Sequence, residues 1–189
     1  MNKFLVSMVA SACLVGACSA AVAGNTGMYV LGGFGTSANN HGWGDDIGSQ
    51  FAIGKRTDSY DFKVAGTYSH SSMEGYEGVH EDYINGTSNI YGVAMAVAKI
   101  HPVNDKWSFR YGLAAEYHHL TDTNDENNEG HGYGVGLFVG PSVAVAENAS
   151  IDVDLHVLTY DRDSFTDVGG HLTDIQLFNG VSVGFLYFF

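Results

Sequence analysis

The sequence predicts an all-β chain: an eight-stranded antiparallel up-and-down transmembrane β-barrel, preceded by a cleaved signal peptide. Three observations lead to this fold class. Residues 181–189 form a closing strand whose alternate residues are Val, Phe and Tyr, so that one face is wholly apolar. Runs of about ten residues with the same two-residue alternation recur along the chain. The connections between these runs alternate between long and short, as in membrane barrels.

Residues 1–23 predict the signal peptide. Lys3 supplies a positive charge, residues 4–15 are apolar but too few to span a bilayer, and residues 21–23 (Ala-Val-Ala) provide a cleavage site. Removing 23 of the 189 residues leaves 166, which is enough for one domain. We therefore expect a single outer-membrane barrel domain over residues 24–189.

Composition excludes several classes of function. The formal net charge is −13, and it becomes −14 when Lys3 is removed with the leader, so the phosphates of nucleic acids would be repelled and no nucleic-acid partner is expected. Both cysteines, Cys13 and Cys18, precede residue 24, which leaves neither a disulfide nor a thiolate metal ligand. Residues 15–18 also fit a lipoprotein processing site, and acylation of Cys18 is an open alternative.

Eight runs with the alternation of strands follow the leader. In order they cover residues 26–36, 48–57, 60–70, 89–101, 107–119, 132–145, 150–160 and 173–189. No apolar stretch of about 20 residues occurs after the leader, so any membrane span must be made of strands.

The connections between the runs carry independent information. Four are long and polar, at residues 37–47, 71–88, 120–131 and 161–172, and three are short, at 58–59, 102–106 and 146–149. This is the layout of an outer-membrane barrel with long external loops, short periplasmic turns and both termini in the periplasm. A soluble lipocalin-like barrel is the alternative, and it would place its apolar residues inside.

The faces of the last four runs decide between these barrels. In the fifth run aromatic residues alternate with Arg110 and Glu116, and in the sixth bulky residues alternate with glycines. In the seventh, Asp152 and Asp154 alternate with Ile, Val and Leu, and the eighth sets Gly and Ser against Val and Phe. The interior of an eight-stranded barrel is only wide enough for side chains. Small and charged residues therefore belong inside, and the apolar face points out to lipid.

The predicted inner face carries several ionisable residues. They are Lys63, Arg110, Glu116, Asp152, Asp154 and His156. The fifth and seventh strands are roughly 10 Å apart, so Arg110 is within reach of Asp152 or Asp154 across the small residues between them. A charge in a narrow lumen is costly unless it is paired. We predict a salt-bridged plug that closes the barrel; a gated pore or proton path is the alternative.

The remaining motifs give little chemistry. The loop histidines lack the spacing of a metal site, so we expect neither a metal nor a cofactor. His70-Ser71-Ser72 resembles the His-x-Ser of lipid A deacylases, but Met73 stands where that family has Asn. A nucleophilic Ser also needs a base and an acid that orients the base. We expect no enzyme, with a deacylase-like, lipid A-modifying enzyme as the alternative.

The chain resembles the small-barrel family of Ail, OmpX and Lom outer-membrane proteins, and more distantly the membrane domains of OmpA type. The resemblance rests on residues 103–107 with 111–112, on 133–137, on 149–154 and on the aromatic C-terminus. Residues 28–33 resemble the opening strand of several such families, and residues 37–90 match poorly. The resemblance implies an eight-stranded barrel. Family members are associated with adhesion, invasion and serum resistance through external loops, which do not match here.

We therefore expect a virulence-related, non-enzymatic protein of the bacterial outer membrane. Its acidic external loops would serve adhesion or serum resistance, and its barrel would support envelope integrity. The longest loop, 71–88, offers three candidate contact residues: Tyr76, His80 and Tyr83. The alternative is that these side chains only rest on lipid headgroups.

The expected partners follow from this location. They are outer-membrane lipids with lipopolysaccharide, the barrel-assembly machinery, and a host or surface ligand at the loops. The assembly machinery would read a C-terminal signal made by Phe185, Tyr187 and Phe189. The protein is expected to be a monomer.

Overall fold

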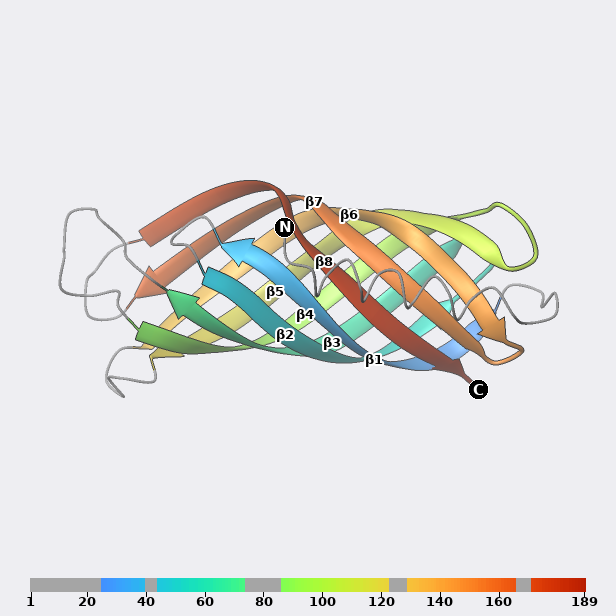
Figure 1. Cartoon of the computed structure of the whole chain (residues 1–189), viewed down its shortest axis with the longest axis horizontal. Helices are drawn as coiled ribbons and strands as arrows, with labels where there is room; N and C mark the ends of the chain where they lie inside the picture. The colour runs from blue at the N-terminus through green and yellow to red at the C-terminus, as the bar shows by residue number, and fades with distance from the viewer. Residues whose placement is uncertain (1–24, 40–43, 74–85, 123–128, 166–170) are drawn as a thin grey trace.

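The computed structural model describes residues 25–39, 44–73, 86–122, 129–165 and 171–189. These residues form eight strands: β1 (Gly27–Asn39), β2 (Gly44–Arg56), β3 (Tyr60–Met73), β4 (Gly86–Pro102), β5 (Trp107–Asp122), β6 (Glu129–Ala146), β7 (Ala149–Phe165) and β8 (His171–Phe188). Each strand is antiparallel to the next, and β8 pairs with β1 to close the barrel (Figure 1). Among the described residues, no helix is long and apolar enough to cross a membrane.

The eight predicted strands and their order are confirmed. The short connections at 57–59, 103–106 and 147–148 lie at the end of the barrel that holds the C-terminus, which we call the turn end (Figure 1). The opposite ends of the strands, which the long connections join, form the loop end. Most strands extend two to four residues further toward the loop end than the sequence pattern predicts. The predicted signal peptide, residues 1–23, lies outside the described residues.

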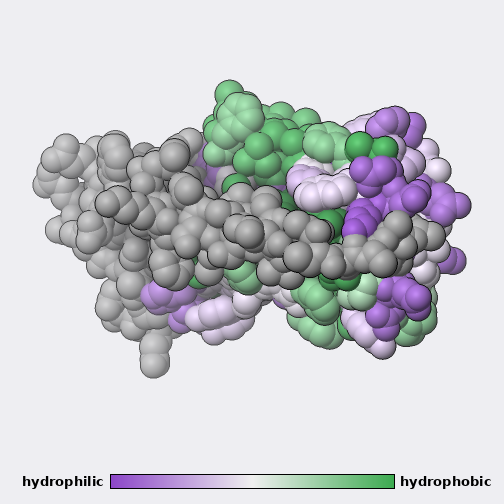
Figure 2. All heavy atoms as spheres, turned by 45° about the vertical axis from the view of Figure 1, so that its right-hand side comes forward, coloured by the Kyte–Doolittle hydropathy of each residue, from purple (hydrophilic) through white to green (hydrophobic). Residues whose placement is uncertain are grey.

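The outer wall is apolar. Large hydrophobic side chains that alternate along the strands are exposed, among them Phe51 at 64%, Met95 at 63% and Leu113 at 56%. Figure 2 shows apolar residues gathered on the wall and hydrophilic residues at the turn end. The predicted faces of β5 to β8 are confirmed, because the bulky residues point outward and the small and charged ones inward. The soluble-barrel alternative, with its apolar residues inside, is therefore wrong.

Two rings of aromatic residues border this wall. The turn-end girdle consists of Tyr60, Phe62, Phe109, Tyr111, Tyr187 and Phe189, and the loop-end girdle of Tyr68, Tyr91, Tyr117 and Tyr133, all of them exposed. On β5 the two girdles are separated by the rise of residues Phe109 to Tyr117, roughly 20 Å along the barrel axis for a tilted strand. This spacing suits the hydrocarbon layer of an outer membrane, with aromatic rings at both interfaces.

The strand ladder is irregular on β7 and β8. Val157 has no register partner on β6 or β8, and Phe178 and Asn179 have none on β7. Phe178 also has a φ of 56°, a left-handed conformation that few residues other than glycine adopt. The bulge at Val157 shifts the alternation of β7, so that Thr159 points inward beyond it and accepts a hydrogen bond from Asn179 Nδ2 at 2.7 Å.

Candidate functional site

The lumen holds a group of buried ionic side chains at the turn end. We call it the lumen charge cluster: Arg56, Asp61, Lys63, Arg110, Asp152 and Asp154. The turn between β2 and β3 brings Arg56 and Asp61 together, while Arg110 comes from β5 and the other two carboxylates from β7. Arg110 is 1% exposed, and Lys63, with 14%, is the most accessible member.

Arg110 is the centre of the cluster. Its Nη1 lies 2.7 Å from Asp152 Oδ2 and 3.0 Å from Asp61 Oδ2. Its Nη2 donates to Asp154. The guanidinium therefore joins β5 to β3 on one side of the barrel and to β7 on the other. The sequence placed Arg110 within reach of Asp152 or Asp154, and the structure has it in contact with both.

Arg56 forms a second bridge beside the first. Its Nη2 lies 2.6 Å from both Asp61 Oδ2 and Asp152 Oδ2, and its Nη1 donates to Ser142 Oγ at 2.9 Å. Tyr29 donates its hydroxyl to Asp61 Oδ1 at 2.7 Å. Each carboxylate thus meets at least one cation, which is the condition for burying charge at tolerable cost.

Small residues on β6 let these bridges form. Arg110 stands directly opposite Gly140, and Asp152 stands opposite Ser142. A Cβ on Gly140 would collide with the carbonyl of Val153 on β7. The arginine therefore crosses β6 without meeting a side chain at its own level.

The cluster is electrically balanced and sealed. Its three cations face three carboxylates. Tyr29, Leu31, Leu186 and Phe188, each at most 5% exposed, pack at the turn end beside it. The Arg56 guanidinium carbon lies 5.5 Å from the Phe188 ring centroid. In the described residues, the side chains of the cluster are thus paired and shielded from solvent, as a salt-bridged plug requires.

Two predicted members of the lumen network lie apart from the cluster. Glu116 accepts a hydrogen bond from Thr67 Oγ1 at 2.6 Å. His156 lies inside β7 on the loop side of Asp154 and forms no salt bridge with the described residues. The structure thus brings four of the six predicted residues together in the cluster. Glu116 and His156 lie in the lumen on the loop side of the cluster.

Sequence reasoning missed Arg56, Asp61 and Tyr29. All three have the alternation of inward residues: Arg56 shares its face with Ala52 on β2, and Asp61 shares its face with Lys63 on β3. Their position on the inward face of the alternation was the feature of the sequence that could have identified them. It was hidden because Arg56 and Asp61 border a turn, where charged residues are ordinarily solvated.

The outer face near the loop end carries the His70 motif. His70 points outward, as predicted, and its Nδ1 lies 3.0 Å from Asn89 Oδ1, which also accepts from the Tyr68 hydroxyl at 3.0 Å. The side chain of Ser72 lies outside the described residues. Among the described residues the ring partner of His70 is an amide, not the orienting acid that a hydrolase needs.

The predicted contact residues of the longest loop, Tyr76, His80 and Tyr83, lie outside the described residues. No group of three or more potential metal ligands occurs in the part of the chain that the structure describes. At the C-terminus, Phe185, Tyr187 and Phe189 are 52%, 47% and 75% exposed and face outward, as predicted for their side of the strand.

The β7–β8 hairpin reaches further toward the loop end than β1 (Figure 1). β8 pairs with β1 only from Gly180 to Phe188. The segment 171–179 of β8 is held by β7 on one side, and no described residue of β1 pairs with it on the other. Such an edge offers backbone groups to a further strand. Beside it, Ile175 and Leu177 are 65% and 70% exposed.

An apolar wall between two aromatic girdles, around a charged lumen, defines the class: this is the architecture of the transmembrane β-barrels of bacterial outer membranes. The structure is similar to Neisserial surface protein A, NspA, with 14% identity and a TM-score of 0.58 over 88% of this chain and 99% of that one. The resemblance lies in the fold, and it confirms the predicted fold class.

Two other solved structures are similar at lower scores. They are Ail, the attachment invasion locus protein of Yersinia pestis (13% identity, TM-score 0.42, 88% of this chain and 99% of that one), and a major outer membrane protein from Thermus thermophilus (13%, 0.47, 87% and 99%). No protein-family model matches the sequence, and no curated protein matches it.

Proposed function

We propose that this protein is a non-enzymatic surface protein of the bacterial outer membrane, which contacts a host or surface ligand at its loop end and supports the envelope through its barrel. The observation that carries the proposal is the difference between the two ends. The turn end holds the paired and buried side chains of the lumen charge cluster. The ends of the strands that the long connections join lie at the loop end, together with the segment 171–179 of β8, with which no described residue of β1 pairs.

The chemistry of the loop end supports a polypeptide ligand of basic character. The connections predicted at 37–47, 71–88, 120–131 and 161–172 contain two, four, four and three acidic residues, and Arg162 is their single Lys or Arg. An extended peptide could add to the β8 edge through its main chain, with apolar side chains beside Ile175 and Leu177. Electrostatic attraction to the acidic loops would speed its arrival.

Two sets of variants test the proposal on cells that display the protein. Deletion of 74–85, with an Asn-Gly turn put in their place, removes the longest loop and keeps the pairing of Met73 with Gly86. Ile175→Lys places a charge at the β8 edge, and Ile47→Lys is its matched control, because Ile47 is 66% exposed but lies on a strand paired on both sides. Cell adhesion and serum survival are measured after surface display is shown to be equal.

We expect the deletion and Ile175→Lys to lower adhesion, and Ile47→Lys to leave it unchanged. Unaltered adhesion and serum survival in both test variants would reject the surface-contact role. Periplasmic termini and a monomeric barrel, assembled through its C-terminal strand, belong to the same proposal. Protease accessibility of a tag inserted directly after residue 24 on intact cells tests the first of these points, because it leaves the C-terminal strand unchanged.

The enzymatic alternative has one supporting feature, the outward His70. Lipid A that keeps its mass when the protein is overexpressed would eliminate it.

A further inference from the structure

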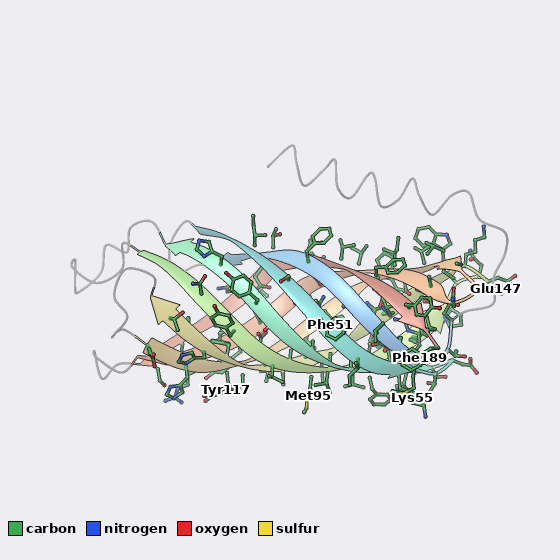
Figure 3. The ribbon with its side chains drawn as sticks, turned by 90° about the horizontal axis from the view of Figure 1, so that it is seen from below. Phe51, Lys55, Met95, Tyr117, Glu147 and Phe189 are labelled. Carbon is green, nitrogen blue, oxygen red and sulfur yellow. The ribbon has the colours of Figure 1, made fainter. Side chains whose placement is uncertain are left out.

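The outward-facing lysines of the barrel all lie at the turn end. Lys55 near the end of β2 and Lys99 near the end of β4 are exposed on the outer wall, and Lys106 lies in the turn before β5. Figure 3 shows Lys55 on the outside of the barrel, at the same end as Phe189 and Glu147. The other rim has no lysine, because every lysine after residue 23 is one of these three or Lys63 in the lumen.

Aromatic side chains of the turn-end girdle flank two of these lysines. Lys55 stands directly opposite Phe62 on β3. Lys99 stands between Tyr60 on β3 and Tyr111 on β5. Residues directly opposite on neighbouring strands have side chains in contact range, about 5 Å apart at Cβ. Because aromatic rings settle at the membrane interface, they place both ammonium groups at the level of lipid headgroups.

These ammonium groups are not neutralised by the protein. Neither Lys55 nor Lys99 forms a salt bridge within the described part of the chain. The nearby acids, Asp58, Asp105 and Glu147, lie in the turns beyond the strand ends, not on the outer wall. A cation on a lipid-facing wall at this height is stabilised by extending to a phosphate.

We propose that the rim formed by Lys55 and Lys99 binds the headgroups of anionic phospholipids in the leaflet at the turn end. The ligand is a lipid because girdle residues that face the bilayer flank Lys99 on both sides and Lys55 on the β3 side, where Phe62 stands, while exposed Met28 stands on the β1 side. It is anionic because the rim presents two ammonium groups at headgroup height that form no ion pair with the described residues. At the loop end, Arg162 is the single fixed cation among many carboxylates, so the same preference is absent there.

Local lipid composition around the purified barrel tests the proposal. Two single-tryptophan reporters are made in a Trp43→Phe, Trp107→Phe background. Tyr111→Trp stands beside Lys99, and Tyr117→Trp stands on the same strand at the opposite girdle. Each is reconstituted in vesicles of equal phosphatidylcholine and phosphatidylglycerol, with one or the other lipid brominated near its headgroup. Fluorescence quenching then reports which lipid contacts each rim.

Brominated phosphatidylglycerol should quench the Tyr111→Trp reporter more strongly, with roughly fivefold enrichment over phosphatidylcholine, the ratio that corresponds to one lysine near a membrane surface. Lys99→Gln should bring that ratio close to one, Lys99→Arg should keep it, and high salt should lower it. The Tyr117→Trp reporter should show no preference. Equal quenching by the two lipids beside Lys99, or a preference that survives Lys99→Gln, would overturn the proposal.

Discussion

Replacement of Arg110 by methionine is the sharpest test of the lumen charge cluster. Methionine keeps much of the length of the side chain and removes its charge and its donors. Arg110 is 1% exposed and contacts Asp61, Asp152 and Asp154. Without it, three buried carboxylates share two cations, so one negative charge is left uncompensated in the lumen.

The expected loss follows from this imbalance. Breaking a buried ion pair by removing one partner costs about 3–5 kcal/mol, chiefly because the remaining charge stays desolvated. Arg56 still holds Asp61 and Asp152 at 2.6 Å, whereas Asp154 keeps only Lys63, at 3.7 Å. We therefore place most of the penalty on Asp154. A second change, Asp154→Asn, restores the balance and should recover most of the free energy of unfolding.

The assay is guanidinium unfolding of the barrel in phosphatidylcholine vesicles, followed by tryptophan fluorescence and by gel mobility with and without heating. Lys99→Met is the matched control, because it removes a cation from an exposed position and should cost less than about 0.5 kcal/mol. The reasoning fails if Arg110→Met unfolds within about 1 kcal/mol of the wild-type protein. It also fails if adding Asp154→Asn deepens the loss.

Four further predictions concern the lumen, the strand ladder and the C-terminus. Gly140→Ala should lower the free energy of unfolding by about 1–3 kcal/mol, because its Cβ meets the Val153 carbonyl, whereas Gly32→Ala, with open space around it, should be neutral; denaturant midpoints compare the two. Planar-bilayer recordings should show no stable unitary conductance, and stable steps from the wild-type protein would contradict a closed lumen. Phe188→Ala should cost about 3–5 kcal/mol in the same unfolding assay, since Phe188 is 5% exposed. Phe189→Ala should slow assembly in cells without changing stability, and a matching stability loss would show that the terminal Phe acts by packing.

The sequence was sufficient for the wall of the barrel. Two-residue alternation, the order of long and short connections, and the size contrast between faces are local properties, so they predicted the strands and their outward residues. Asp152 and Asp154 were assigned to the lumen for the same reason: they alternate with Ile151 and Val153. These features depend only on neighbouring residues within one strand. Their prediction therefore does not require the stagger between strands to be known.

The cluster itself needed information that no single strand contains. Arg56 and Asp61 meet Arg110 only because the stagger of the strands brings the turn between β2 and β3 to its height. The bulge at Val157 shifts the alternation of β7 on its loop side, so that Thr159 points inward, whereas inward Asp152 and Asp154 have even numbers. A pattern of apolar and polar residues does not reveal such an insertion, since both sides of the bulge continue to alternate.

The glycines of the lumen explain how so narrow a barrel encloses such large inward side chains. Tyr29 stands directly opposite Gly54 and Phe138 opposite Gly112, and a Cβ on either glycine would strike the facing ring. Arg110 stands opposite Gly140 in the same way. A large inward side chain on one strand therefore faces a glycine on the next strand. This pairing lets the side chains fill the lumen without lengthening the hydrogen bonds between strands. A lumen packed in this manner leaves no room for a ligand at the level of the cluster, so selective contacts belong to the two rims. One rim offers fixed lysines to lipid phosphates, and the other offers acidic loops and a strand edge.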